Sequence, residues 1–366
     1  MSETDIWKEH AFPYVRTFVS ETEARATYQR LREYHVTTHE SPTVYRLDKV
    51  QLSATYERPG NYAILPLNKA NYFELNYLTD YFTEPSRMRA RRYNRDTPLD
   101  TWVKHRADGT IDSQAPLREQ RDALYNTTIE ASNFRLNVAC TLLDHFCPRS
   151  IFDPCAGHGD RAFAAYSRSY VQRYEACDPN ALTCDLITKG LETLDVWQQE
   201  QDGCCSSAKK TFVVRPLPVE DFFAQVEAIP ELKTQHFGLY DMVFTSPPYG
   251  DTEIYFDSSS QEKKTTQSIC RHPDAEEWYT CWLRPVFQRA WNLLRAGGVM
   301  AISINNVRDH KSDERFDRRR KTPARQSRPV LRFQVVERLV ADLSQTLTDN
   351  VYVGVMSYAD RGLCVA

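Results

Sequence analysis

The sequence contains no long apolar run, no Cys-x-x-Cys pair and no large excess of charge of either sign. No stretch approaches the roughly 18 apolar residues of a membrane-spanning helix, and the first residues, MSETDIWKEH, lack the apolar core of a signal peptide. We therefore expect an intracellular protein, cytoplasmic or nuclear, that is neither secreted nor associated with a membrane. The net charge of −3 gives no overall attraction to nucleic acid, so any such attraction must come from local basic segments.

The ten cysteines do not follow the spacing of a disulfide framework or of a zinc site. Cys204 and Cys205 are adjacent, and a chain of 366 residues can bury a full core without covalent cross-links. We expect reduced thiols and no metal site. The content of 41% hydrophobic and 26% charged residues is typical of a folded globular protein.

Two parts of the chain differ in their patterns. Residues 1–125 are rich in Tyr, Arg and Thr, with weak strand-like alternation at 43–56 and helical spacing of aromatic residues at 71–82. From about residue 126, short apolar runs alternate with segments of helix length, which is typical of an α/β unit with a parallel sheet. We predict an α+β appendage over 1–125, with a possible role in substrate recognition, and a main domain over 126–366.

The main domain is predicted to be a Rossmann-like, doubly wound, mostly parallel seven-stranded sheet that ends in an antiparallel hairpin. The predicted strands are 150–154, 173–179, 211–216, 240–246 and 298–304, with the hairpin near the C-terminus, and the predicted helices are 133–146, 159–170, 181–200, 275–294 and 335–347. The polar segment 307–329 is predicted to be a mobile basic loop.

A glycine-rich corner follows the first of these strands, in the stretch FDPCAGHGDR. Gly157 and Gly159 allow positive φ and close approach of the backbone to a ligand, and the helix that follows offers unpaired N–H groups. The next strand ends at Asp178, where an acidic residue commonly binds ribose hydroxyls in doubly wound sheets. A tight turn and a surface aspartate would explain each feature alone, but the two corners together favour an adenosine-like ligand.

A second corner, TSPPYG, follows the strand 240–246. Prolines cannot donate to a sheet, so the strand must end at Ser246. Pro247 and Pro248 fix the backbone and aim the Pro247 carbonyl, and Tyr249 offers a ring on which a base can stack. A stiff turn without chemical function is the alternative for this corner taken alone.

The two corners together resemble the motifs of the S-adenosylmethionine-dependent amino-methyltransferases. Asp-Pro-Cys-Ala-Gly-His-Gly resembles their DPFxGxG motif, and Ser-Pro-Pro-Tyr resembles their (D/N/S)PPY motif, in the order of the N4-cytosine and N6-adenine DNA enzymes that are not circularly permuted. Asn-Phe-Arg before the first strand is similar to the element that these enzymes place at the methionine end of the cofactor. The resemblance covers about residues 130–366, and Cys155 replaces the usual Phe.

The resemblance implies the class I methyltransferase fold, S-adenosylmethionine as cofactor and methyl transfer to an exocyclic amino group. The implied catalytic residues are Ser246, Pro247, Pro248 and Tyr249. The implied cofactor-binding residues are Phe134, Asp153, Pro154, Cys155, Ala156, Gly157, Gly159, Asp178 and Ser246, together with Glu220, Asp221 and Phe222 at the third-strand corner. Ser246 Oγ and the Pro247 carbonyl would accept the amino hydrogens and leave the nitrogen lone pair available. No cysteine nucleophile is needed, and His158 could touch the cofactor.

Two basic segments make a nucleic-acid partner the expectation. Residues 85–106 carry seven Lys and Arg against two Asp, and residues 308–328 carry nine against four acids. The candidate phosphate-binding residues are Arg87, Arg89, Arg91, Arg92, Arg318, Arg319, Arg320 and Lys321. Each run alone could equally be a solvated surface.

The target stays open at this point. DNA is favoured, by base flipping of cytosine or adenine. In the family that the motifs resemble, a first-position Ser looks most like the N4-cytosine enzymes, which weakly favours cytosine. The alternatives are an RNA base, a protein glutamine amide, and a non-catalytic subunit that binds nucleic acid. The sequence does not indicate an oligomeric state.

Overall fold

We describe the protein from a computed structural model of the whole chain. The structure describes residues 3–34, 69–92, 96–128, 131, 133–202, 210–248, 253–255, 267–304, 307–308, 332–333, 335, 338–339, 342, 352–359 and 362–365. The predicted strand at 43–56 and nearly all of the predicted basic loop at 307–329 lie outside these residues, as does most of the predicted helix at 335–347.

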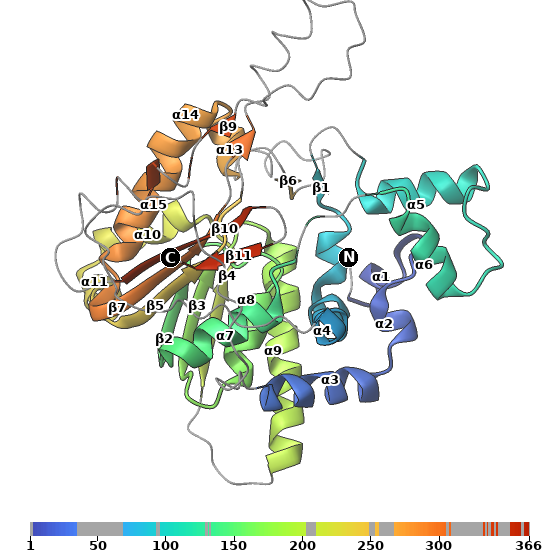
Figure 1. Cartoon of the computed structure of the whole chain (residues 1–366), viewed down its shortest axis with the longest axis horizontal. Coiled ribbons are helices and arrows are strands. Elements are labelled where there is room, and N and C mark those ends of the chain that lie inside the picture. Colours follow the sequence, from blue (N-terminus) through green and yellow to red (C-terminus); the bar gives the residue numbers. More distant parts are fainter. Residues whose placement is uncertain are drawn as a thin grey trace, which may run out of the picture.

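A mostly parallel sheet forms the centre of the fold, with the strand order β11-β10-β7-β5-β2-β3-β4 (Figure 1). Its strands are β2 (Ser150–Asp153), β3 (Arg173–Cys177), β4 (Thr211–Arg215), β5 (Tyr240–Thr245), β7 (Leu294–Ser303), β10 (Tyr352–Ala359) and β11 (Gly362–Val365). All neighbouring pairs are parallel except β10 and β11, which form the predicted antiparallel hairpin. The predicted doubly wound α/β sheet is therefore confirmed.

The central strands are buried on both faces because successive side chains point to opposite sides of a strand. On β2, Ile151 belongs to one hydrophobic cluster and Phe152 to the other. On β5, Met242 and Phe244 lie in the first cluster, and Val243 lies in the second. Such strands read as continuous apolar runs, which is why they could be found in the sequence.

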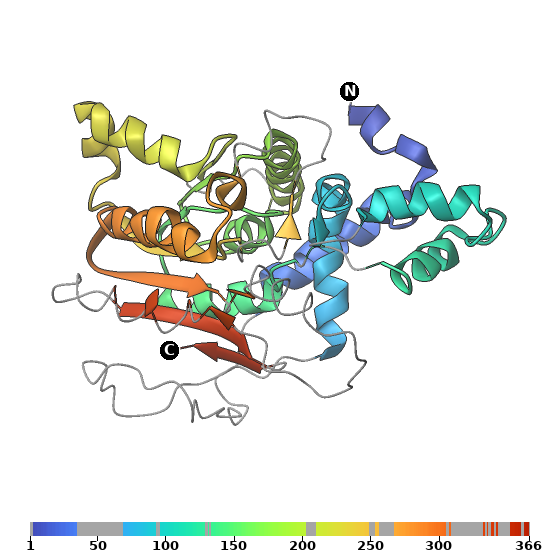
Figure 2. The same ribbon diagram turned by 90° about the horizontal axis from the view of Figure 1, so that it is seen from above.

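Helices cover both faces of the sheet (Figures 1 and 2). The first face carries α7 (Leu136–Phe146), α8 (Asp160–Ser167) and α9 (Ala181–Asp202), and the second carries α10 (Val219–Ala228), α11 (Pro230–His236) and α15 (Arg284–Trp291). The helices α10 and α11 were not predicted from the sequence. The chain proceeds from β2 to β3 and β4 in one direction and then returns to place β5 on the other side of β2. This reversal creates a switch point between β2 and β5, where ligands bind in doubly wound sheets.

The predicted helix at 275–294 is divided into three parts. These are α14 (Ala275–Glu277), a π-helix (Trp278–Leu283) and α15. Pro285, in the first turn of α15, has no N–H to donate to the preceding turn, so the regular ladder is interrupted next to the π-helix. Short π-helical segments are frequent at functional sites.

The described part of residues 3–125 is helical apart from the two-residue strand β1 (Arg91–Arg92). The helices are α1 (Glu3–Ile6), a 3-10 helix (Glu9–Ala11), α2 (Val15–Phe18), α3 (Glu21–Glu33), α4 (Lys69–Arg87), α5 (Pro98–Ala107) and α6 (Leu117–Tyr125). Tyr28 of α3 and Phe82 of α4 share a hydrophobic cluster with Phe163 of α8 and Trp197 of α9. Figure 1 shows α5 and α6 farther from the sheet, where Trp102 and Leu124 belong to a separate small cluster.

The remaining short elements lie beside the strand ends. The strand β6 (Glu253–Ile254) pairs antiparallel with β1, and β8 (Val307–Arg308) pairs with β9 (Arg332–Phe333). The helix α13 (Ser268–Arg271) precedes α14. Among the described residues, no helix is both long enough and apolar enough to cross a membrane.

Arg168 provides a test of how α3 is held against the sheet domain. Its buried guanidinium donates to Asp144 Oδ1 at 2.7 Å and to the carbonyl oxygens of Leu31 and Tyr34 at 2.8 and 2.7 Å. Arg168→Met should lower the free energy of unfolding by about 3 kcal/mol, because it leaves two carbonyl groups without this donor and leaves Asp144 with the Tyr170 hydroxyl alone. Urea unfolding followed by circular dichroism measures the change. Arg30→Met, on the exposed side of α3, is the control and should change it by less than about 0.5 kcal/mol.

Candidate active site

A pocket lies at the carboxyl ends of four adjacent strands. Its wall includes Cys155 after β2, Asp178 after β3, Glu220 after β4 and Ser246 after β5. The strand order β5-β2-β3-β4 fixes the order of these corners along the sheet edge. Because neighbouring strands are about 4.8 Å apart, the four corners span roughly 14 Å, which suits an elongated ligand. The fold thus brings both sequence motifs to one pocket.

The two glycines of the first corner have different roles. Gly157 lines the pocket with φ of 57°, and a Cβ there would meet only Arg161 Nη2, at 3.9 Å. Gly159, with φ of 91°, precedes α8, and a Cβ there would lie 2.7 Å from Ile187 Cγ1 of α9. Gly157 therefore shapes the pocket wall, whereas Gly159 is required by the close packing of α8 against α9.

Three of the predicted cofactor-binding residues lie behind the pocket and are not part of its wall. Asp153 is fully buried and accepts from Arg161 Nε and Tyr174 Oη, both at 2.7 Å. Ala156 is buried within the corner, and the Phe134 ring packs 5.5 Å from the Phe244 ring. These residues hold the corner in place, while Pro154 and Cys155 line the pocket.

Asp178 presents a half-buried carboxylate to the pocket. Oδ2 accepts from the Gly157 N–H at 3.1 Å and Oδ1 accepts from the Asn180 N–H at 2.9 Å. Burial raises the pKa of Asp178 to about 7 despite these two bonds. Each oxygen keeps a second lone pair, so that this carboxylate can still accept hydroxyl donors from a ligand.

The third-strand corner differs from the prediction at two of three positions. Glu220 lines the pocket and forms an ion pair with Arg271 at 3.3 Å. Asp221 is exposed and is not among the lining residues. Phe222 is buried in the core with its ring 5.1 Å from that of Phe152, so it is not available to pack against a ligand in the pocket. The sequence did not show which residues at the start of α10 face the pocket. The packing of α10 turns Glu220 to the pocket and Phe222 to the core.

The Pro-Pro corner contributes two lining residues. Ser246 and Pro248 are half-buried and line the pocket, whereas Pro247 is buried between them. Tyr249 lies outside the described residues. The strand β6 pairs with β1 of the N-terminal part of the chain. Tyr255, directly after β6, lines the pocket, so the N-terminal part supports this section of the wall.

Several lining residues were not identified from the sequence. They are Pro179, Asn180, Thr183, Pro218, Val219, Tyr255, Gln267, Ser268 and Trp282. Asn180 could have been found, since it directly follows the strand end at Asp178. Trp282 carries no such signal in the sequence. It lies in the π-helix and stacks on Trp278, with ring centroids 5.7 Å apart.

His158 also lines the pocket, between the two glycines. It is buried, and burial lowers its pKa to about 3, helped by the nearby cationic Arg87. The ring is therefore neutral at physiological pH. Among the described residues, its Nε2 has no hydrogen-bond partner.

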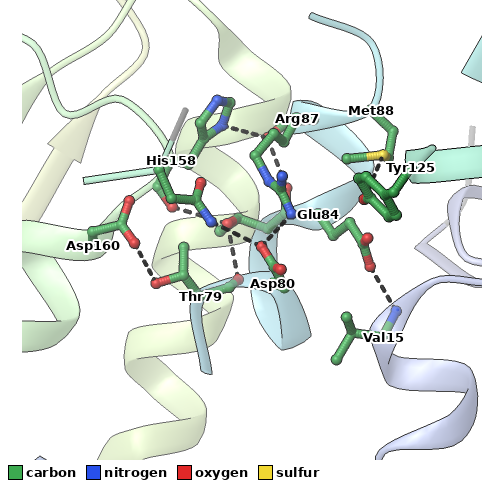
Figure 3. Close-up of polar contacts among 12 residues, drawn as sticks. Val15, Thr79, Asp80, Glu84, Arg87, Met88, Tyr125, His158 and Asp160 are labelled. Atoms are coloured by element: carbon green, nitrogen blue, oxygen red, sulfur yellow. Dashed lines mark hydrogen bonds and ion pairs between the residues drawn. The ribbon is translucent and has the colours of Figure 1, made fainter. Parts of the chain in front are cut away.

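Helix α4 supports the glycine corner from behind (Figure 3). Thr79 Oγ1 donates to Asp160 Oδ1 at 2.7 Å, and Thr83 Oγ1 donates to the His158 carbonyl at 2.9 Å. Burial raises the pKa of Asp160 to about 7. These contacts connect a region outside the recognised motifs to the wall of the pocket.

The structure changes the list of candidate phosphate-binding residues. Arg87 is buried and pairs with Asp80 at 2.6 Å, so it cannot reach a phosphate backbone, and its prediction is corrected. Arg89 pairs with Glu9, and Arg91 is half-buried on β1. The Arg92 side chain and the segment Arg318, Arg319, Arg320 and Lys321 lie outside the described residues. Within the described part of the chain, no three His, Cys, Asp or Glu side chains are grouped so that they could hold a metal ion.

Comparisons with known proteins add little to this geometry. No family model and no curated protein matches the sequence. Similar solved structures include a methyltransferase from Geobacter sulfurreducens, with a TM-score of 0.27 and 11% identity over 54% of this chain and 74% of that chain. An O-methyltransferase from Bacillus cereus in complex with SAH has a TM-score of 0.31 and 11% identity over 74% of this chain and 89% of that chain. Such low TM-scores carry no argument, so the fold and the site rest on the strand order and the pocket.

The neutral ring of His158 predicts a pH-dependent stability. Its pKa is about 3 in the folded state and about 6.5 in an unfolded chain, so the unfolded state binds more protons between these values. His158 therefore lowers the free energy of unfolding as the pH falls below about 6.5. Above that pH it does not make the free energy of unfolding depend on pH. Relative to the wild type, His158→Asn should gain up to about 2 kcal/mol of unfolding free energy between about pH 7.5 and about pH 5, measured by urea unfolding.

The control for this measurement is His145→Asn, at an exposed position of α7. Its difference from the wild type should change less over the same pH range. If His158→Asn follows the wild type at both pH values, the buried neutral ring is contradicted.

Proposed function

We propose that this protein transfers a methyl group from S-adenosylmethionine to an exocyclic amino nitrogen of a nucleic-acid base. The observation that carries the proposal is the single pocket that joins the glycine corner, Asp178 and Ser246 at the switch point of the sheet. The two motifs lie about 90 residues apart in the sequence, and the parallel order of β2 and β5 makes them neighbours.

The pocket residues fit S-adenosylmethionine by the chemistry of their donors and acceptors. Asp178 keeps free lone pairs for ribose hydroxyls, and Glu220 offers a carboxylate one strand farther along the edge, where an adenine amino group would need an acceptor. Gly157 leaves room at the wall between Asp178 and Ser246.

The chain contributes acceptors and position to the proposed reaction. When bound, S-adenosylmethionine supplies an electrophilic methyl group on a sulfonium sulfur. Ser246 Oγ and the Pro247 carbonyl would accept hydrogen bonds from the target amino group and keep its lone pair out of conjugation with the ring. Pro248 stiffens this corner, so the acceptors need little reorganisation as positive charge develops on nitrogen. No covalent intermediate with the protein is required.

DNA is the proposed target, through N4 of cytosine or N6 of adenine, with the base flipped into the pocket. The resemblance of the Ser-Pro-Pro-Tyr motif supports this choice. Arg91 is a candidate for contact with the phosphate backbone of the DNA. It lies on β1, which pairs with β6, and β6 directly precedes the lining residue Tyr255. A base in RNA poses the same chemical problem and is an alternative outcome of the transfer experiment below.

Methyl transfer should depend on Ser246. Incubation with labelled S-adenosylmethionine and separate DNA, RNA and protein pools, followed by digestion and mass analysis, identifies the methylated group. Ser246→Ala should lower the rate by about 100-fold, because it removes an acceptor that acts on the reacting nitrogen. Ser169→Ala, at an exposed position before β3, is the matched control and should retain the wild-type rate. Full activity of Ser246→Ala would contradict the assigned site.

Cofactor affinity should depend on Asp178 and not on Asp221. Asp178→Asn should weaken S-adenosylmethionine binding by about tenfold or more in calorimetry, because a hydroxyl donor loses a charged acceptor. The exposed Asp221→Asn is the matched control. Because hydroxyl donors favour the carboxylate form, and the pKa of Asp178 is about 7, the wild-type affinity should rise as the pH increases through about 7. If the wild-type protein binds no S-adenosylmethionine, the proposed methyltransferase activity is ruled out.

A further inference from the structure

His158 holds a buried polar atom at the pocket wall that the proposed reaction does not yet use. The residue is 6% exposed, lines the pocket, and its Nε2 has no hydrogen-bond partner among the described residues. A buried nitrogen without a partner costs free energy, so native structures rarely keep one without a ligand, a water or a functional reason.

The contacts of Ser86 determine which ring nitrogen of His158 carries the proton. Ser86 Oγ donates to the Thr83 carbonyl at 2.9 Å and lies 3.4 Å from His158 Nδ1. A hydroxyl has a single proton, and a carbonyl oxygen can only accept. The shorter contact favours the Thr83 carbonyl as acceptor of the Ser86 proton, which leaves Ser86 to accept from Nδ1–H. The neutral ring then has its proton on Nδ1, and Nε2 presents a lone pair.

Helix α4 holds the backbone around His158 at two points. Thr83 Oγ1 donates to the His158 carbonyl, and Asp160, two residues later, accepts from Thr79 (Figure 3). The His158 ring centroid lies 6.1 Å from that of Tyr255, which also lines the pocket.

The strand order places His158 between Ser246 and Asp178 along the edge of the sheet. His158 follows β2, and Ser246 follows β5, the neighbour of β2, whereas Asp178 and Glu220 follow β3 and β4. A ligand whose ribose binds Asp178 would therefore meet His158 with its other end, close to the place of methyl transfer.

We propose that His158 Nε2 accepts a hydrogen bond from an N–H donor of the ligand at the Ser246 end of this pocket. The inference rests on the proposed function. Two groups in that reaction can donate an N–H. They are the ammonium at the amino-acid end of the cofactor and the amino group of the target base. The ring holds this donor and does not remove its proton, because burial and the nearby cations keep the ring neutral.

Two ligands distinguish the ammonium from the target amino group. S-adenosylhomocysteine contains the amino-acid end, and 5′-methylthioadenosine lacks it. If the ammonium is the donor, His158→Leu should weaken S-adenosylhomocysteine binding by about tenfold and leave 5′-methylthioadenosine binding unchanged in calorimetry. His158→Gln, whose amide oxygen can replace the acceptor, should recover most of the affinity.

If the target amino group is the donor, both affinities stay unchanged. In that case His158→Leu should lower kcat/KM for methyl transfer by about tenfold, and His158→Gln should restore it. Unchanged binding together with an unchanged rate overturns the inference. An equal loss of affinity for both ligands also overturns it, because the ring would then only shape the wall.

A measurement on the wild-type protein does not depend on the folding of any variant. Nitrogen NMR of ¹⁵N-histidine-labelled protein should show His158 with an unprotonated Nε2 whose resonance shifts when S-adenosylhomocysteine binds, or when the nucleic acid is added. A protonated Nε2, or a resonance that neither ligand shifts, overturns the inference. A wild-type protein that binds no S-adenosylhomocysteine contradicts the proposed function instead.

Discussion

The buried ion pair between Arg161 and Asp153 is the interaction on which the rest of the site depends. Arg161 Nε donates to Asp153 at 2.7 Å, and the same guanidinium bonds the Cys155 carbonyl and lies 6.0 Å from the Phe244 ring. The Tyr174 hydroxyl donates to the same oxygen of Asp153, Oδ2. Buried charges are tolerated only when their partners are complete, and here those partners come from β2, β3, β5 and α8. The pair thus holds the glycine corner against β3 and α8.

The N-terminal helices contribute to the same arrangement and do not stand apart from it. Glu84 of α4 accepts from the Val15 N–H at 2.6 Å and pairs with Arg121 of α6, so α4 is anchored to two other parts of the N-terminal region. The opposite side of α4 contacts the glycine corner through Thr79 and Thr83. Burial raises the pKa of Glu84 to about 7, and the neighbouring Arg121 guanidinium opposes this rise. The region predicted as an appendage therefore supports the pocket wall.

Prediction from the sequence succeeded where local pattern and chemistry coincide. Strands buried on both faces read as apolar runs, and Gly157 and Ser246 lie where a strand must end, so both corners were found. Prediction failed where packing decides. Phe222 and Arg87 have types common at ligand sites, but α10 turns one into the core and Asp80 pairs with the other. Trp282 lines the pocket from a π-helix, which the sequence pattern did not predict.

The sequence alone determined the order of the two motifs, the alternation of strands and helices, and the kind of chemistry that a Ser-Pro-Pro corner can support. These features depend on neighbouring residues and on backbone geometry, which the sequence states directly. The tertiary structure decided that both motifs share one pocket, that Asp153 lies behind it while Asp178 faces it, and that α4 orients His158. These features depend on contacts between residues far apart in the chain, and only the strand order and the packing of helices on the sheet bring such residues together.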